Sequence, residues 1–69
     1  MAKLKINGVD KQFPNGLPKN VDDLLKELGL SSETVVAEVE GQIIERKNFA
    51  ATQLQDGQSI ELVRLMPGG

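Results

Sequence analysis

Neither cysteine nor histidine occurs anywhere in the 69 residues of this chain. Without cysteine there is no disulfide framework and no thiolate nucleophile. Because histidine is absent as well, the Cys–His and Ser–His nucleophile pairs and the common zinc sites are excluded. No side chain with an ordinary pKa near neutrality remains to act as a general base. The composition therefore predicts a protein that is not an enzyme, with no catalytic residue and no metal site.

Aromatic residues, basic blocks and long apolar runs are also scarce. Aromatics make up 3% of the chain, the net charge is −2 and the pI is about 4.9. Nucleic-acid binding would favour a basic face with aromatics for stacking, so no nucleic-acid partner is expected. No run approaches the roughly 18 apolar residues of a membrane span, and the start MAKLKING lacks the apolar segment of a signal peptide. We therefore expect a soluble, cytoplasmic protein with no membrane partner.

The first half of the chain predicts a hairpin followed by a helix. Residues 3–6 alternate lysine with leucine or isoleucine, and residues 9–13 form a return strand after Asn7-Gly8. This dipeptide tolerates the positive φ angles of a type I′ turn. Asn20 is a candidate helix N-cap, with aspartates in the first turn. A helical apolar stripe then follows, ending before Gly29: Val21, Leu24, Leu25 and Leu28.

The second half of the chain predicts three more strands. Alternation over TVVAEVEG gives a strand with one buried face, Gly41-Gln42 is interpreted as a turn, and residues 43–44 as a short strand. Asn48 is a candidate cap of a single helical turn that buries Phe49 and Leu54. Along the first of these strands Glu38 and Glu40 could share a face, which we interpret as solvated rather than as a metal site.

The last predicted strand, QSIELVRL, has two distinct faces. Ile60 and Leu62 are expected to face the helix, so Val63 and Leu65 face outwards. Two interpretations of this outward pair stay open. A small protein always exposes some apolar side chains, and single exposures carry no meaning. Alternatively, Val63 and Leu65 form a small patch that docks a partner beside the end of the chain.

The chain ends in Met66-Pro67-Gly68-Gly69, which we interpret as a flexible tail on a single domain of residues 1–69. Glycines carry no β-carbon, so Gly68 and Gly69 suit passage through a narrow channel. Met66 and Pro67 stiffen the approach and prevent the last strand from continuing. A terminal glycine also offers the least hindered carboxylate of any chain end. We therefore predict that the tail delivers the Gly69 carboxylate into the active site of another protein.

The order of these elements and the Gly-Gly end resemble the ubiquitin-like β-grasp family, and within it the ThiS-type sulfur carriers of thiamine biosynthesis. The resemblance covers the whole chain. It rests on the Asn7-Gly8 hairpin and on the segments VDDLLKELGL, VVAEVEGQII, EGQIIERKNF and LQDGQSIELV. The chain departs from the family pattern at Glu40 (often Asn), Glu45 (often Pro), Phe49 (usually Trp) and Gln58 (often Asp).

The resemblance implies a fold, a chemistry and partners. The fold is an α+β β-grasp, a mixed sheet with one helix across one face and with the first and last strands adjacent in its middle. A ThiF-type (E1-like) adenylating enzyme would use ATP and magnesium to adenylate the Gly69 carboxylate. A sulfur donor such as a cysteine desulfurase would then convert Gly69 to a thiocarboxylate (1-thioglycine), which donates its sulfur to a ThiG-type thiazole synthase. The carrier binds no cofactor and is expected to be monomeric when free.

Two other functions remain open from the sequence. The small subunit of molybdopterin synthase is a close relative that uses the same tail thiocarboxylate, although such chains tend to be longer. A ubiquitin-like modifier or a plain binding module would share the fold without carrying sulfur. The ending PGG does not by itself separate these possibilities.

Overall fold

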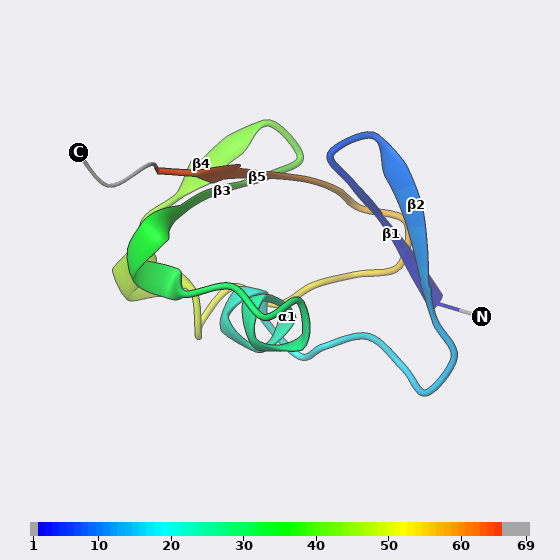
Figure 1. The fold of residues 1–69 in the computed structure, drawn as a ribbon. Helices are drawn as coiled ribbons and strands as arrows, with labels where there is room; N and C mark the ends of the chain where they lie inside the picture. Colours follow the sequence, from blue (N-terminus) through cyan, green and yellow to red (C-terminus); the bar gives the residue numbers. More distant parts are fainter. Residues whose placement is uncertain (1, 66–69) are drawn as a thin grey trace.

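The computed structural model describes residues 2–65, which form a mixed five-stranded sheet with one helix (Figure 1). Helix α1 lies against one face of the sheet and leaves the other face open, which gives the two-layer α+β arrangement expected from the sequence. The elements in chain order are β1 (Ala2–Ile6), β2 (Val9–Phe13), α1 (Val21–Glu27), the 3₁₀ turn η1 (Ser32–Thr34), β3 (Val35–Val39), β4 (Gln42–Ile44), the 3₁₀ turn η2 (Arg46–Asn48) and β5 (Ser59–Arg64).

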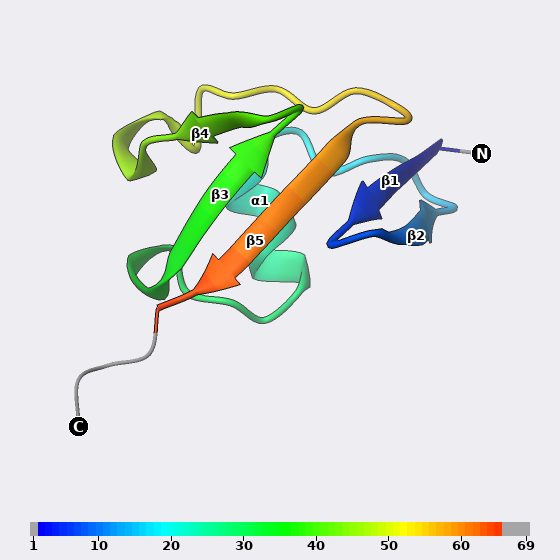
Figure 2. The same ribbon diagram turned by 90° about the horizontal axis from the view of Figure 1, so that it is seen from above.

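The first and last strands are neighbours in the middle of the sheet, as predicted. The strand order is β2-β1-β5-β3-β4, and Figure 2 shows β5 between β1 and β3 with the helix behind the sheet. Strands β1 and β5 are parallel and pair through Lys5–Ser59 and Ile6–Ile60. The other pairs are antiparallel. Strand β5, which leads to the tail residues, therefore has a hydrogen-bonded strand on each side.

Two hairpins have tight two-residue loops. Asn7 and Gly8 have φ angles of 51° and 83°, which confirms the predicted type I′ turn. In the second hairpin Val39 pairs with Gln42, so the loop is Glu40-Gly41 and the predicted loop Gly41-Gln42 is wrong by one residue. Glu40 takes a φ of 51°, a conformation that asparagine tolerates better than glutamate.

A carboxylate–backbone bond accompanies this unfavourable conformation. The Ser59 N–H donates to Oε2 of Glu40 at 3.1 Å, and the Glu40 N–H donates to the Ser59 carbonyl at 2.9 Å. Glu40 therefore lies in the turn and does not share a strand face with Glu38, contrary to the expectation from the sequence. The Glu40 carboxylate therefore connects the β3–β4 hairpin to the start of β5, which is a structural role.

Helix α1 begins and ends close to the predicted residues. The Asp23 N–H donates to Oδ1 of Asn20 at 2.8 Å, which confirms the predicted N-cap. The helix ends at Glu27, with Leu28 as its C-cap and Gly29 at a φ of 73°. The predicted helical turn after Asn48 lies earlier, because η2 begins at Arg46 and ends at Asn48. Glu45, and not Asn48, is the residue that precedes this turn as its N-cap.

The hydrophobic core lies between the helix and the sheet. The residues fully excluded from solvent are Leu4, Val21, Leu24, Ala37 and Ile60. The remaining buried core residues are Phe13, Leu25, Val35, Val39, Phe49, Leu54 and Leu62. Among residues 2–65 no buried polar side-chain atom lacks a hydrogen-bond partner. The core thus joins the predicted helical stripe to the alternating positions of β1, β3 and β5.

Candidate functional site

The candidate site is the stretch where β5 leads towards the chain end. Val63 lies on the open face of β5, and Leu65 follows the strand directly. Their exposed fractions are 55% and 53%, whereas Ile60 and Leu62 are buried, so the predicted division of faces is confirmed. The predicted tail residues Met66, Pro67, Gly68 and Gly69 lie outside the described residues.

The end of β5 is held from both sides. On one side the Leu65 N–H donates to the Thr34 carbonyl at 2.7 Å. On the other side the Leu62 N–H donates to Oδ1 of Asn7 at 2.7 Å, and Nδ2 of Asn7 donates to the Leu62 carbonyl at 3.1 Å. The Asn7 amide therefore continues the pairing of β5 beyond the last residue of β1, so the strand that leads to the tail is fixed in direction.

Four apolar side chains lie on the same open face near this end. Val36 pairs directly with Val63 across β3 and β5, and Ile43 on β4 is 70% exposed. Leu65 lies beyond Val63. We call the set Val36, Ile43, Val63 and Leu65 the open-face patch. Sequence reasoning singled out Val63 and Leu65 but missed Val36 and Ile43. The alternation of β3 assigns Val36 to this face. Only the strand register shows that Val36 lies opposite Val63 of β5 and that Ile43 lies opposite Glu38 of β3.

A surface hollow borders the open-face patch. Its volume is about 310 Å³, and its lining includes Val36, Ile43 and Leu65 together with Phe49 and Arg46. Most of the lining is apolar, with charged side chains among its residues. Such a concave apolar surface beside a chain end suits a contact with another protein better than it suits a small polar substrate.

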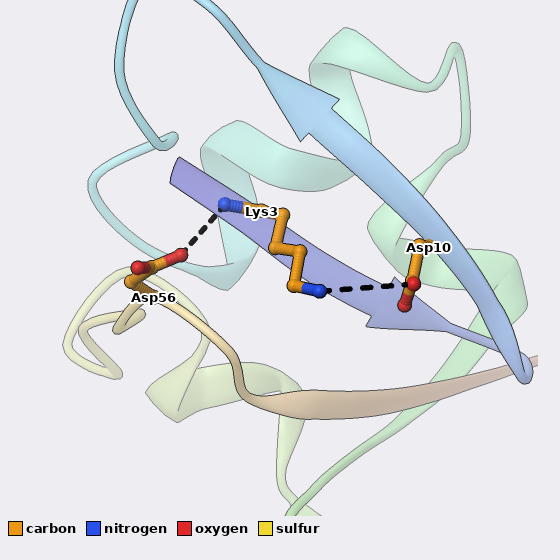
Figure 3. A network of polar contacts seen from close by, with 3 residues as sticks. All are labelled: Lys3, Asp10 and Asp56. Carbon is orange, nitrogen blue, oxygen red and sulfur yellow. Dashed lines mark hydrogen bonds and ion pairs between the residues drawn. The ribbon is translucent and has the colours of Figure 1, made fainter. Parts of the chain in front are cut away.

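A second hollow, of about 360 Å³, lies at the opposite end of β5 and is polar. Lys3 and Lys5 line it, and Nζ of Lys3 lies 3.8 Å from the carboxylate of Asp10 (Figure 3). The Lys3 N–H donates to Oδ1 of Asp56 at 2.7 Å. Because the Lys3–Asp10 pair is exposed, it contributes little to stability. The Asp56 bond ties the loop before β5 to the start of β1, which is a structural role.

Two features are absent from the described residues. Within residues 2–65 no group of three or more His, Cys, Asp or Glu side chains is placed to hold a metal ion. In the same part of the chain no helix is long and apolar enough to cross a membrane. Within residues 2–65 the notable features are the open-face patch, which is largely exposed, and strand β5, which is held on both sides.

Comparison with known proteins adds the following findings. The model of the ThiS family matches residues 4–69. A thiazole synthase of Paramagnetospirillum magneticum is 34% identical over 67 residues, which cover 97% of this chain and 20% of that protein. This chain therefore spans about a fifth of the length of that relative.

Two solved structures are also similar, and both are thiamine biosynthesis proteins of Geobacter metallireducens. The crystal structure, of ThiS, has a TM-score of 0.83 at 34% identity and covers 97% of this chain and 99% of its own. The solution NMR structure has a TM-score of 0.81 at 34% identity, with coverages of 97% and 87%. The α+β β-grasp fold predicted from the sequence is thereby confirmed.

Proposed function

This chain belongs to the ThiS family, and from that premise we propose that it carries sulfur for thiamine biosynthesis on the carboxylate of Gly69. The observation that carries the proposal is the family match, which runs through Gly68 and Gly69. The complete absence of cysteine agrees with it, because sulfur would be held on the backbone terminus and not on a thiol. The proposed role is that of a co-substrate whose partners perform the catalysis.

The proposed chemistry has two steps, which together we call charging. A ThiF-type adenylating enzyme with ATP and magnesium joins the Gly69 carboxylate to AMP and releases pyrophosphate. Sulfide displaces AMP directly and leaves a thiocarboxylate, whereas persulfide sulfur displaces AMP to give an acyl disulfide, which a thiol reductant cleaves to the same thiocarboxylate. A cysteine desulfurase is the proposed source of this sulfur, and a ThiG-type thiazole synthase is its proposed recipient. The sequence of this chain offers no histidine or cysteine to assist either step, so the bases and the metal belong to the partners.

The open-face patch is proposed as the surface that docks these partners. Ile43, Val63 and Leu65 are exposed and Val36 is half-buried, and Leu65 directly precedes the tail. A partner that covers the patch would therefore receive Met66, Pro67, Gly68 and Gly69 next to the contact. The fixed direction of β5 supports the same proposal. Because this strand is held on both sides, it limits the range of positions open to the tail carboxylate.

A neutral polar substitution in the patch tests the docking role. We expect Val63→Asn with Leu65→Asn to weaken binding of the adenylating enzyme about tenfold, because apolar area leaves the contact. The melting temperature should change little, since both side chains are exposed. Val9→Asn is the matched control, because Val9 is 68% exposed on β2, the edge strand beyond β1. Equal affinities for the double variant and the control would remove the patch from the docking surface.

Intact mass spectrometry tests the proposed function itself. The protein is incubated with a ThiF-type enzyme, MgATP and sulfide, beside a chain that lacks Gly69. We expect a mass gain of one oxygen-for-sulfur exchange in the natural chain and none in the shortened chain. A control carrier shows that the enzyme is active. If the control carrier is charged while this chain stays at its original mass, the sulfur-carrier proposal is wrong.

A further inference from the structure

The centre of the open sheet face holds two glutamates directly opposite each other. Glu38 on β3 and Glu61 on β5 are partners in the antiparallel register. Side chains in such pairs have β-carbons about 4.5–5.5 Å apart, and like charges placed there destabilise a sheet. Glu38 is half-buried and Glu61 is exposed. The fold therefore places two acidic residues directly opposite each other, in a pairing that does not favour the stability of the sheet.

Among the described residues no lysine or arginine lies within ion-pair distance of either glutamate. The ion pairs among residues 2–65 join Lys3 to Asp10, Lys26 to Asp22 and Lys47 to Glu45, and they leave Glu38 and Glu61 without a partner. Lys5 lies opposite Ser59, two residues before Glu61, and forms no ion pair with either glutamate. Within residues 2–65 no hydrogen bond reaches either carboxylate, in contrast to Glu40, whose carboxylate accepts from the backbone.

The glutamate pair adjoins the open-face patch. Along β5, Glu61 and Val63 are alternate residues on one face, and Val63 pairs with Val36. On the other flank Glu38 pairs with Ile43 of β4. In Figure 2 strands β3 and β5 lie side by side with the helix behind them, so this face is open to an approaching partner. The surface thus presents a pair of carboxylates bordered by apolar side chains.

We propose that this face docks the adenylating enzyme through a surface that sets a cationic side chain between Glu38 and Glu61 and apolar side chains on the open-face patch. The inference rests on the proposed function and specifies the chemistry of its partner. A guanidinium or ammonium group between the two carboxylates replaces their repulsion with two attractions. The apolar contacts around it exclude water, which strengthens those attractions. Complementary charge of this kind also raises the association rate and rejects partners with an acidic surface.

The test measures binding of the purified adenylating enzyme by the chain in which both glutamates are neutralised. We expect Glu38→Gln with Glu61→Gln to lower the association rate about tenfold and to flatten its dependence on salt. The melting temperature should stay equal or rise, since a repulsion is removed. The matched control is Asp23→Asn with Glu27→Gln, which changes the net charge equally on α1, at the helix-covered face.

The possible outcomes separate the two proposals. A slower association of the Glu38 and Glu61 variant alone supports the docking surface. Equal rates and salt dependences for both double variants overturn it and leave the sulfur-carrier function standing. Unchanged binding together with new self-association of the neutralised chain would also overturn it, and would show that the glutamates guard an exposed sheet face. If the natural chain is neither bound nor charged, the proposed function fails and the assigned partner fails with it.

Discussion

Charging of a Gly68→Val variant by the adenylating enzyme is expected to be about a hundredfold slower than charging of the natural chain, measured as kcat/KM. Glycine has no β-carbon, whereas valine adds a branched side chain next to the proposed reacting carboxylate. A channel that accepts a Gly-Gly end has no room for that side chain, and a displacement of about 1 Å in a reacting group is enough for a loss of this size. The measurement is the rate of thiocarboxylate formation, followed by mass spectrometry.

Controls show whether the loss comes from the channel. Gly68→Ala adds only a methyl group, so its kcat/KM should lie between those of the natural chain and the valine variant. Position 68 lies beyond β5, after the residues that build the core, so both variants should melt at the temperature of the natural chain. Natural rates in the valine variant would mean that the end of the chain does not enter a narrow site, and the tail would then be a docking peptide at most.

An Asn7→Ala variant is expected to lose about 2–4 kcal/mol of unfolding free energy. Two hydrogen bonds to the backbone of Leu62 disappear, each contributing about 0.5–1.5 kcal/mol. Alanine must also adopt a φ of 51°, which disfavours it relative to asparagine by about 1 kcal/mol. In a 69-residue protein the total is a large part of the stability, and the melting temperature should fall by about 10 °C or more. Thermal and urea unfolding provide the measurement.

Two further substitutions at this position separate the causes. Asn7→Gly keeps the positive φ available but removes both side-chain bonds, so it isolates their contribution. Asn7→Asp retains the acceptor for the Leu62 N–H and loses the donor, so it should be the least damaging. Faster hydrogen exchange of the Leu62 amide in the alanine and glycine variants would locate the damage at β5. Stabilities equal to that of the natural chain would show that the Asn7 amide adds nothing to the pairing of the central strands.

Strand β5 shows why the sequence predicted part of the candidate site and missed the rest. Strict alternation over residues 59–64 assigned Ile60 and Leu62 to the core and Val63 to the open face, because the side-chain period of a strand is two. The partners of Val63 on that face come from a strand more than twenty residues earlier. Which residue lies opposite it depends on the β3–β5 register, and no local pattern specifies a register between distant strands.

The second hairpin shows the same limit at shorter range. Its apolar pattern predicts two strands with a turn at Gly41-Gln42, where glycine favours a turn. The structure places Glu40 at positive φ, with its carboxylate on the backbone of Ser59. Because that contact joins the hairpin to Ser59, which lies outside it, the sequence of the hairpin alone does not reveal it. A local preference therefore gave way to a tertiary contact.

The sequence by itself determined the elements whose causes are local. These are the Asn7-Gly8 turn, the capped helix that follows Asn20, the buried face of β5, and the Gly68-Gly69 end that makes a carrier function chemically reasonable. Only the tertiary structure decided that Asn7 bridges to Leu62 and that Glu38 lies opposite Glu61. The physical reason is that capping and turn formation act over a few residues, whereas strand register is set by how the helix and sheet pack as a whole.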